Sequence, residues 1–517
     1  MEQYKKQKKQ NGITRAIVFG SSILVQMVWL VVLLILLQGY YPVVSIAFSI
    51  AALIVALYVF GQNMNSAFKF PWLILILAFP IVGLSLYFLT GHSALNKRQI
   101  NRFNTVAEWI RAFGEKFTHD KTKFSPDAQV IANQSGYISN IAHYPAHFGS
   151  KVQYYSDAAS CFKDMIEEIK KAEKFVFMEY HAIEDSDYCS ALFDALEDRA
   201  KHGVDVRLIY DEVGSLVFID QEFARKMERR GISCRIFNPI MPTINILMNN
   251  RDHRKITVID GIVSFSGGFN LADEYFNLIA PYGYWKDTGI KITGDASLNL
   301  TTIFLEMWNQ IKQTDTESAI KGFLKASKNS VSDPNGYLVQ PYADSPLDNE
   351  TVGKNVYLNI IAGAQKYIWI STPYLIIDDE TFGALTLAAG RGVDVRIVIP
   401  GIPDKKIVYR ATKTYATWLA KNNVKIYTYK PGFNHAKQIL CDDAQACCGT
   451  INFDYRSLYF HFENSVFFND RQAMNDMKKD FKQMFSDSEE STEKFANRLK
   501  VRNILYDNII RLIAPLF

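Results

Sequence analysis

The chain has 517 residues, of which 48% are hydrophobic and 21% are charged. This composition excludes a disordered or low-complexity protein, and the length is typical of about three structural units. Lysine and arginine total 57 against 53 for aspartate and glutamate, so the net charge is only +4. A protein that binds nucleic acid mainly through bulk positive charge is therefore not expected.

The N-terminal region contains long apolar segments. Over residues 16–96, Lys69 is the only lysine, arginine, aspartate or glutamate. Apolar runs of about 18–22 residues are long enough for helices that cross a bilayer, and a signal peptide would not be followed by two further runs. We therefore predict a membrane anchor over residues 1–96, with two or three transmembrane helices drawn from the runs 16–37, 43–60 and 71–89.

The charges at the two ends of this anchor leave its orientation in the membrane open. Basic residues precede the first run and follow the third, and the positive-inside rule favours the cytoplasm for both. Three full crossings cannot place both ends there, so either one run does not cross or one basic end lies outside. Pro80 is expected to kink the helix of the third run without ending it. The basic stretch after the third run favours the cytoplasmic side for the part of the chain that follows the anchor.

After a polar, partly helical connector over residues 97–150, the sequence pattern occurs twice. Residues 172–179 and 364–371 are β-branched and aromatic runs typical of strands. A helical stretch follows each run, and a glycine then ends the helix before another strand, at Gly203 in one copy and Gly392 in the other.

Strands that alternate with helices indicate an α/β sheet covered by helices. Because the pattern is repeated in the same order, we predict two duplicated α/β/α sandwich halves with the active site between them. The expected boundaries are 151–330 for the first half and 331–490 for the second.

Each half contains one copy of the motif HxKxxxxD, followed by a glycine-containing turn and an asparagine. On a strand, residues two apart face the same side, so the histidine and lysine of each copy should project together. The aspartate is expected at a hairpin turn, where it would hold the loop or the lysine. The residues are His253, Lys255, Asp260 and Asn270 in the first copy, and His435, Lys437, Asp442 and Asn452 in the second.

Two imidazoles at one interface suit chemistry on a phosphodiester. One can attack phosphorus while the other, when protonated, donates to the leaving alkoxide. The two lysines and two asparagines would hold the phosphoryl oxygens and stabilise charge in the transition state. Nothing in the motifs requires a metal or another cofactor, because ammonium groups supply the positive charge.

With these motifs the chain resembles the phospholipase D superfamily, and within it the membrane-anchored bacterial cardiolipin synthases. The resemblance covers nearly the whole chain. It is carried by the paired motifs and by the segments 72–91, 267–275, 285–287, 371–374, 449–457 and 511–517.

The resemblance implies that two phosphatidylglycerol molecules become cardiolipin and glycerol through a phosphohistidine intermediate. It implies that His253 is the nucleophile and His435 the general acid and base. Lys255 and Lys437 would hold the phosphate, with Asp260 and Asp442 completing the motifs. Asp287 and Glu463 are expected to orient the imidazoles through their second ring nitrogens. The resemblance also implies a bacterial multi-pass protein of the cell membrane, with its catalytic part in the cytoplasm. A homo-oligomer is compatible with the sequence, and no nucleic-acid partner is expected.

Four positions depart from the family pattern: His181, Asp252, Ile377 and His461. None removes a catalytic group, but they leave the acceptor open. The acceptor would be water in a phospholipase D and a different alcohol in a phosphatidylserine synthase-type phosphatidyltransferase. The low net charge disfavours a nuclease, and the two intact motifs disfavour a non-catalytic membrane scaffold.

The C-terminal residues 491–517 carry apolar groups at helical spacing beside arginines and a lysine. We predict an amphipathic helix there. It would either lie on an anionic bilayer surface or pack against the catalytic core.

Overall fold

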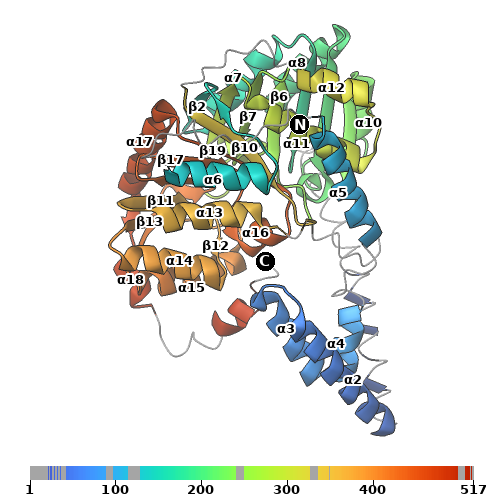
Figure 1. Cartoon of the computed structure of the whole chain (residues 1–517), viewed down its shortest axis with the longest axis vertical. Coiled ribbons are helices and arrows are strands. Elements are labelled where there is room, and N and C mark those ends of the chain that lie inside the picture. The colour runs from blue at the N-terminus through green and yellow to red at the C-terminus, as the bar shows by residue number, and fades with distance from the viewer. Residues whose placement is uncertain are drawn as a thin grey trace.

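The computed structural model describes residues 42–88, 97–113, 129–239, 250–325, 336–348, 350–498 and 507–512, with a few single positions between 21 and 36 and Ala514. Most of the first apolar run and residues 499–506 lie outside the described residues. Figure 1 shows a large α/β body, from one end of which helices α2, α3 and α4 project.

The first half is built on a seven-stranded sheet with the order β2-β9-β7-β6-β3-β4-β5. Strands β3, β4 and β5 are parallel, and the other neighbours are antiparallel. The elements are β2 (Lys151–Tyr155), α7 (Ala158–Ile169), β3 (Phe175–Tyr180), α8 (Asp187–Lys201), β4 (Asp205–Asp211), α9 (Glu212–Ser215), α10 (Phe223–Arg229), β5 (Ser233–Phe237), β6 (Lys255–Ile259), β7 (Val263–Gly267), β8 (Tyr284–Lys286), β9 (Gly289–Thr293), α11 (Ser297–Ile311) and α12 (Glu317–Lys325).

The second half repeats this order as β10-β19-β17-β16-β11-β13-β14, and adds β1 and β20 at the edges of its sheet. The expected duplication of an α/β half is confirmed. The elements are β10 (Leu338–Asp344), α13 (Val352–Gly363), β11 (Tyr367–Ser371), β12 (Leu375–Ile376), α14 (Asp379–Gly390), β13 (Asp394–Pro400), α15 (Lys406–Ala420), β14 (Lys425–Tyr429), β15 (Gly432–Asn434), β16 (Gln438–Cys441), β17 (Gln445–Gly449), β18 (Phe453–Asp454), α16 (Tyr455–Tyr459), β19 (Glu463–Phe468), α17 (Arg471–Asp487), β20 (Ser488–Glu490) and α18 (Thr492–Ala496).

The central strands are buried on both faces, which explains their continuous rather than alternating apolar pattern. All six side chains of β3 are buried. On one face, Phe177 of β3 stacks on Phe304 of α11, with ring centroids 4.7 Å apart. The opposite face packs against α7 and α8, and the apolar cluster around α11 continues into the second half.

The segment expected as a connector is packed into the α/β body. It contains α5 (Lys97–Arg111), α6 (Gln129–Asn140) and β1 (His147–Phe148). Helix α5 packs on α11, where Arg111 pairs with Glu306 at 2.6 Å, whereas β1 extends the second sheet beside β10. This segment therefore contacts both halves.

Helices α2 (Pro42–Gly61), α3 (Ser66–Ala78) and α4 (Pro80–Leu86) form an N-terminal bundle. The expectation that Pro80 kinks one continuous helix is wrong, because α3 ends at Ala78 and Pro80 begins α4. A Cβ atom at Gly83 would lie 2.5 Å from the Cα atom of Ile76, so only glycine permits this close return of the chain. Among the described residues, we find no helix with both the length and the apolarity that a membrane crossing requires.

The described C-terminal parts pack on the second half. Helix α18 lies against α15, and Asp507 pairs with Arg410 of α15 at 2.9 Å. The continuous amphipathic helix expected here includes residues 499–506, which lie outside the described residues.

Candidate active site

The two motif histidines lie just before β6 and β16, at the interface of the halves. The backbone N–H of His253 donates to the carbonyl of Phe462 over 2.9 Å, and that of His435 donates to Lys286 over 2.7 Å. Strand β15, which precedes His435, also pairs in parallel with β8 of the first half. Each motif is therefore anchored by backbone hydrogen bonds to the other half.

Each imidazole is also held by a carboxylate from the other half. Nδ1 of His253 lies 2.9 Å from both carboxylate oxygens of Glu463, and Nδ1 of His435 lies 2.6 Å from Asp287. A carboxylate at Nδ1 fixes the ring orientation and leaves Nε2 for the substrate. The structure thus places Asp287 and Glu463, the two acids singled out from the sequence, directly on the histidines.

The carboxylates are themselves positioned by the segments around them. Hydroxyl groups of Ser457 and Thr450 donate to Glu463, and the backbone N–H of Thr288 donates to Asp287 over 2.9 Å. A Cβ atom at Gly268 would lie 2.1 Å from the Asp287 carboxylate, which accounts for glycine at this position.

Lys255 and Lys437 are almost completely buried beside the histidines, each 1% exposed. Nζ of Lys255 donates to the carbonyl of His253 over 2.8 Å, and Nζ of Lys437 lies 2.9 Å from Nδ1 of His435. Burial lowers the pKa of Lys255 to about 8 and that of Lys437 to about 7.

The surroundings of both motif histidines favour the neutral imidazole. Burial and then the positive charge of Lys437 lower the pKa of His435 to about 3. Burial, followed by the charges of Lys255 and Lys437, holds the pKa of His253 well below its usual value. A neutral imidazole has a free lone pair, as a nucleophile requires.

A cavity of about 630 Å³ lies between the halves, and both motif histidines line it. Asn270 and Asn452 also line it. Asn270 already accepts from the N–H of Ala182 over 3.2 Å and donates to the hydroxyl of Tyr275 over 2.7 Å. Asn270 is therefore held rigidly at the cavity wall.

The motif aspartates lie away from this cavity, at the turns that follow β6 and β16. Asp260 accepts from the backbone N–H groups of residues 173–175, and Asp442 accepts from those of residues 365–367. Both adopt the left-handed backbone conformation, with φ of 53° and 56°. Each aspartate thus ties its hairpin to the start of the neighbouring strand, β3 or β11.

Two further histidines flank His253. The ring centroid of His181 lies 5.1 Å from that of His253, and the centroid of His461 lies 5.5 Å away. His181 contacts the carbonyl of Asp252 through Nδ1 at 2.7 Å. The sequence marked both as departures from the family pattern but gave them no role. Ser457 and Thr450 were also missed, although both lie in the quoted segment 449–457.

Among the described residues, His253, His461 and Glu463 form the group whose donor atoms lie close enough to hold a metal ion, within 4.8 Å of one another. Glu463 already accepts from His253, Ser457 and Thr450. The positive charges of Lys255 and Lys437 act on His253 as well, and they disfavour a divalent cation here.

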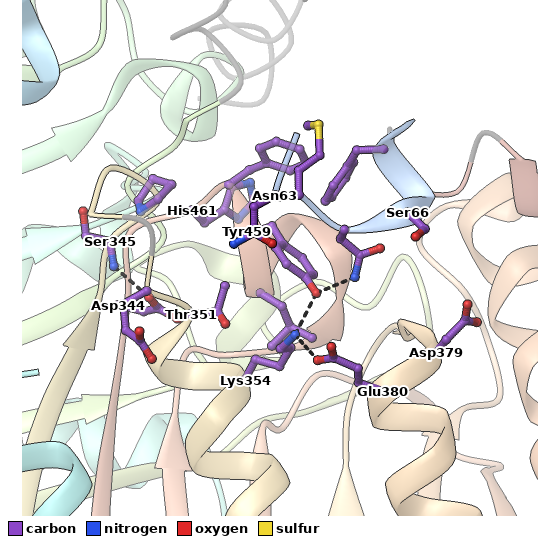
Figure 2. Close-up of a pocket in the computed structure, with 17 residues that line it drawn as sticks. Asn63, Ser66, Asp344, Ser345, Thr351, Lys354, Asp379, Glu380, Tyr459 and His461 are labelled. Carbon is purple, nitrogen blue, oxygen red and sulfur yellow. Dashed lines mark hydrogen bonds and ion pairs between the residues drawn. The ribbon is translucent and has the colours of Figure 1, made fainter. Parts of the chain in front are cut away.

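His461 also lines a second cavity, of about 920 Å³, between the N-terminal bundle and the second half. Figure 2 shows the residues that line this cavity, with His461 next to Tyr459 and with Lys354 and Glu380 below them in the view. The junction of the bundle with the body therefore lies next to the cavity that contains the motif histidines.

Two equivalent halves that meet at a pair of carboxylate-oriented histidines define a phosphodiester-processing site of phospholipase D type. The family model described as cardiolipin synthase, PLD-like domain matches residues 165–308 and 357–485, more than half of the chain. The chain belongs to this family. The phospholipase D-nuclease N-terminal model matches residues 47–92.

Relatives align with almost the whole chain. An uncharacterised protein of Streptococcus mutans is 38% identical over 463 residues, covering 89% of this chain and 99% of the relative. A cardiolipin synthase of Alkalihalophilus pseudofirmus is 31% identical over 478 residues, covering 91% and 93%. One of Clostridium perfringens is 32% identical over 464 residues, covering 88% and 95%. With the N-terminal match, these relatives indicate membrane association.

A solved structure is similar in fold. The phosphatidylserine synthase of Haemophilus influenzae superimposes with a TM-score of 0.55 at 14% identity, covering 76% of this chain and 100% of that one. This likeness supports the duplicated α/β architecture.

Proposed function

We propose that this protein is a membrane phosphatidyltransferase that makes cardiolipin and glycerol from two molecules of phosphatidylglycerol. The observation that carries the proposal is the pair of histidines, each oriented through Nδ1 by a carboxylate of the opposite half. Both line one cavity, and the buried lysines beside them match the charge of a phosphodiester.

In the first step, Nε2 of His253 attacks the phosphorus of one phosphatidylglycerol. A P–N bond forms, the P–O bond to the headgroup breaks, and His435 supplies the proton that the departing glycerol oxygen takes up. The negative charge of the bound diester favours the protonated form of His435, which offsets the lowering of its pKa by burial.

In the second step, a headgroup hydroxyl of another phosphatidylglycerol attacks the phosphohistidine. His435 accepts the proton of this hydroxyl, a P–O bond forms, and the P–N bond breaks to regenerate His253. Lys255, Lys437, Asn270 and Asn452 hold the phosphoryl oxygens in both steps. If water took the place of the second lipid, the same intermediate would give phosphatidic acid.

The N-terminal bundle is proposed to be the membrane anchor of a multi-pass protein, with the α/β body on the cytoplasmic side. The bundle presents a large apolar surface, because many of its side chains are exposed although the bundle has its own small core. The exposed large apolar residues are Ile46, Ile50, Leu53, Ile54, Leu57, Tyr58, Phe60, Met64, Phe70, Ile74, Leu77, Phe79 and Phe88.

The function is tested with purified protein in phosphatidylglycerol liposomes without added metal. Cardiolipin and glycerol should form in equal amounts, and neither should form with His253→Ala or His435→Ala. Phosphatidic acid and glycerol without cardiolipin would make the protein a hydrolase. Absence of all these products would contradict both assignments.

A further inference from the structure

Helix α16 links the N-terminal bundle to the histidine that we propose as nucleophile. It begins at Tyr455, directly after the cavity residues Asn452 and Asp454, and ends at Tyr459. Its middle residue, Ser457, donates its hydroxyl to Glu463 and accepts from the backbone N–H of Asn452 over 2.9 Å. The position of α16 therefore determines where Ser457 holds the carboxylate that orients His253.

The bundle contacts the other end of this short helix. The side-chain amide of Asn65 donates to the hydroxyl of Tyr459 over 2.8 Å. This hydroxyl also accepts from Lys354 of α13 over 3.0 Å (Figure 2) and donates to Asp378 over 2.5 Å. Since Asp378 caps α14, the Tyr459 hydroxyl joins the bundle to three helices of the second half.

Aromatic packing reinforces the polar contact. Phe68 of α3 lies edge-on to the rings of Tyr455, Tyr459 and Phe460, with centroid distances of 5.6, 5.2 and 5.0 Å. Edge-to-face pairs of this kind each contribute about 0.5–1.5 kcal/mol beyond their burial. Phe68 thus contacts both ends of α16.

We propose that Asn65 and Phe68 are positioning residues for the active centre, because they fix α16 and, through Ser457 and Glu463, the imidazole of His253. The N-terminal bundle then helps to position the catalytic histidine, in addition to its proposed role as the membrane anchor. Displacement of the bundle from the body lowers the rate of the chemical step. The catalytic consequence rests on the proposed function, whereas the effect on His253 does not.

The test variant is Asn65→Ser. Asn65 also caps α3, because its Oδ1 accepts from the N–H of Ala67 over 2.9 Å. The side-chain amide of Asn65 also lies 3.4 Å from Asp378. Serine keeps an N-cap but is too short to reach Tyr459 or Asp378, so this variant removes the polar contacts of the bundle with α16 and with the cap of α14. Tyr459→Phe removes the hydrogen bond to Asn65 from the other side, together with those to Lys354 and Asp378, and keeps the ring packing. Lys69→Ala is the matched control, because Lys69 contacts the Phe60 carbonyl within the bundle.

In phosphatidylglycerol liposomes, Asn65→Ser and Tyr459→Phe should each lower kcat about tenfold and leave KM nearly unchanged. Ser457→Ala should lower kcat similarly. Adding Asn65→Ser to this variant should cause no further loss, because the hydrogen bond through which α16 positions Glu463 is already absent. Lys69→Ala should behave as the unmodified enzyme. Wild-type kcat in Asn65→Ser, or additive losses in the double variant, would overturn the proposal.

A second measurement does not depend on catalysis. The rate at which diethyl pyrocarbonate modifies His253, followed by mass spectrometry, reports on the reactivity of its Nε2 atom. Asn65→Ser should change this rate severalfold in the same direction as Ser457→Ala, and Lys69→Ala should not. Equal modification rates in all variants would overturn the proposal even if the protein makes cardiolipin. The same change of rate in Asn65→Ser and Ser457→Ala would support the proposal even if the protein makes no cardiolipin.

Discussion

The carboxylate of Glu463 lies 2.9 Å from Nδ1 of His253, although the two residues belong to different halves of the chain. The relationship is reciprocal, because Asp287 of the first half contacts His435 of the second. Backbone hydrogen bonds show the same reciprocity. The N–H of each histidine donates to the carbonyl of the residue that directly precedes its carboxylate partner in the other half. The arrangement implies that neither half forms a complete site alone.

Replacing either carboxylate by its amide should reduce activity strongly without unfolding the protein. Glu463→Gln and Asp287→Asn keep the shape of the side chain but place an amide where a carboxylate accepts from Nδ1 and stabilises positive charge on the ring. We expect kcat for cardiolipin formation to fall about 10²–10⁴-fold, as for other oriented catalytic histidines. A loss below fivefold for both variants, at unchanged melting temperature, would contradict an orienting role.

The duplicated fold follows from local patterns in the sequence. The apolar runs around Phe177 and Trp369 and the glycines at 203 and 392 mark strands and helix ends, which short-range physics determines. The same holds for Asp260 and Asp442, whose odd offset from the histidine indicated a turn, where the structure places them.

Other features depend on contacts between distant segments. Glu463 and Asp287 stood out from the sequence, but nothing local shows that each serves the histidine of the opposite half. The break at Phe79 depends on the close approach of Gly83 to Ile76 as well as on Pro80. Strand β1 joins the second sheet through His147 and Val339, which are separated by almost two hundred residues. Patterns within one element do not contain such information.

Activity should fall in mildly alkaline solution because the buried lysines lose their charge. Burial lowers the pKa of Lys255 to about 8 and that of Lys437 to about 7. The charged form of a lysine is present below its pKa and is lost as the pH rises through it. We expect kcat/KM for phosphatidylglycerol to decrease above about pH 7, where Lys437 begins to lose its charge, by up to tenfold per pH unit for each charge required.

Replacing each buried lysine by arginine distinguishes the loss of lysine charge from general inactivation at high pH. Arginine stays charged throughout this range, although its planar group fits the site less well. Lys437→Arg should have a lower maximal rate but a smaller relative loss between pH 7 and pH 9. An unchanged alkaline decrease in both Lys437→Arg and Lys255→Arg would assign it to another group.

The motif aspartates should matter for stability. Asp260 accepts from three backbone N–H groups at the start of β3, and Asp442 does the same at β11. Hydrogen bonds to a charged acceptor contribute about 1.5–3 kcal/mol each, less when exposed. We expect Asp260→Ala and Asp442→Ala to lower the free energy of unfolding by about 2–4 kcal/mol. Scanning calorimetry in detergent, with activity followed in parallel, should show activity falling together with the folded fraction.

Asp252 should make the protein less stable as the pH rises. Burial raises the pKa of Asp252. The pKa of the neighbouring Glu179 is raised as well, by burial and by the charge of Asp252. An acid with a raised pKa in the folded state holds its proton longer there than in the unfolded chain. Its contribution to stability is therefore complete below the unfolded pKa and is lost as the pH rises towards the folded one.

Asparagine at position 252 removes this dependence on pH, because an amide does not titrate. Its carbonyl can still accept from the N–H of Arg254, as the Asp252 carboxylate does over 3.1 Å. The melting temperature of Asp252→Asn should exceed that of the unmodified protein by several degrees at pH 8.5 and by less at pH 5.5. Asp194→Asn, at an exposed position of α8, is the control and should show no such trend. A difference that is the same at both pH values would mean that Asp252 is ionised in the folded protein, with Arg254, which also acts on its charge, as the compensating cation.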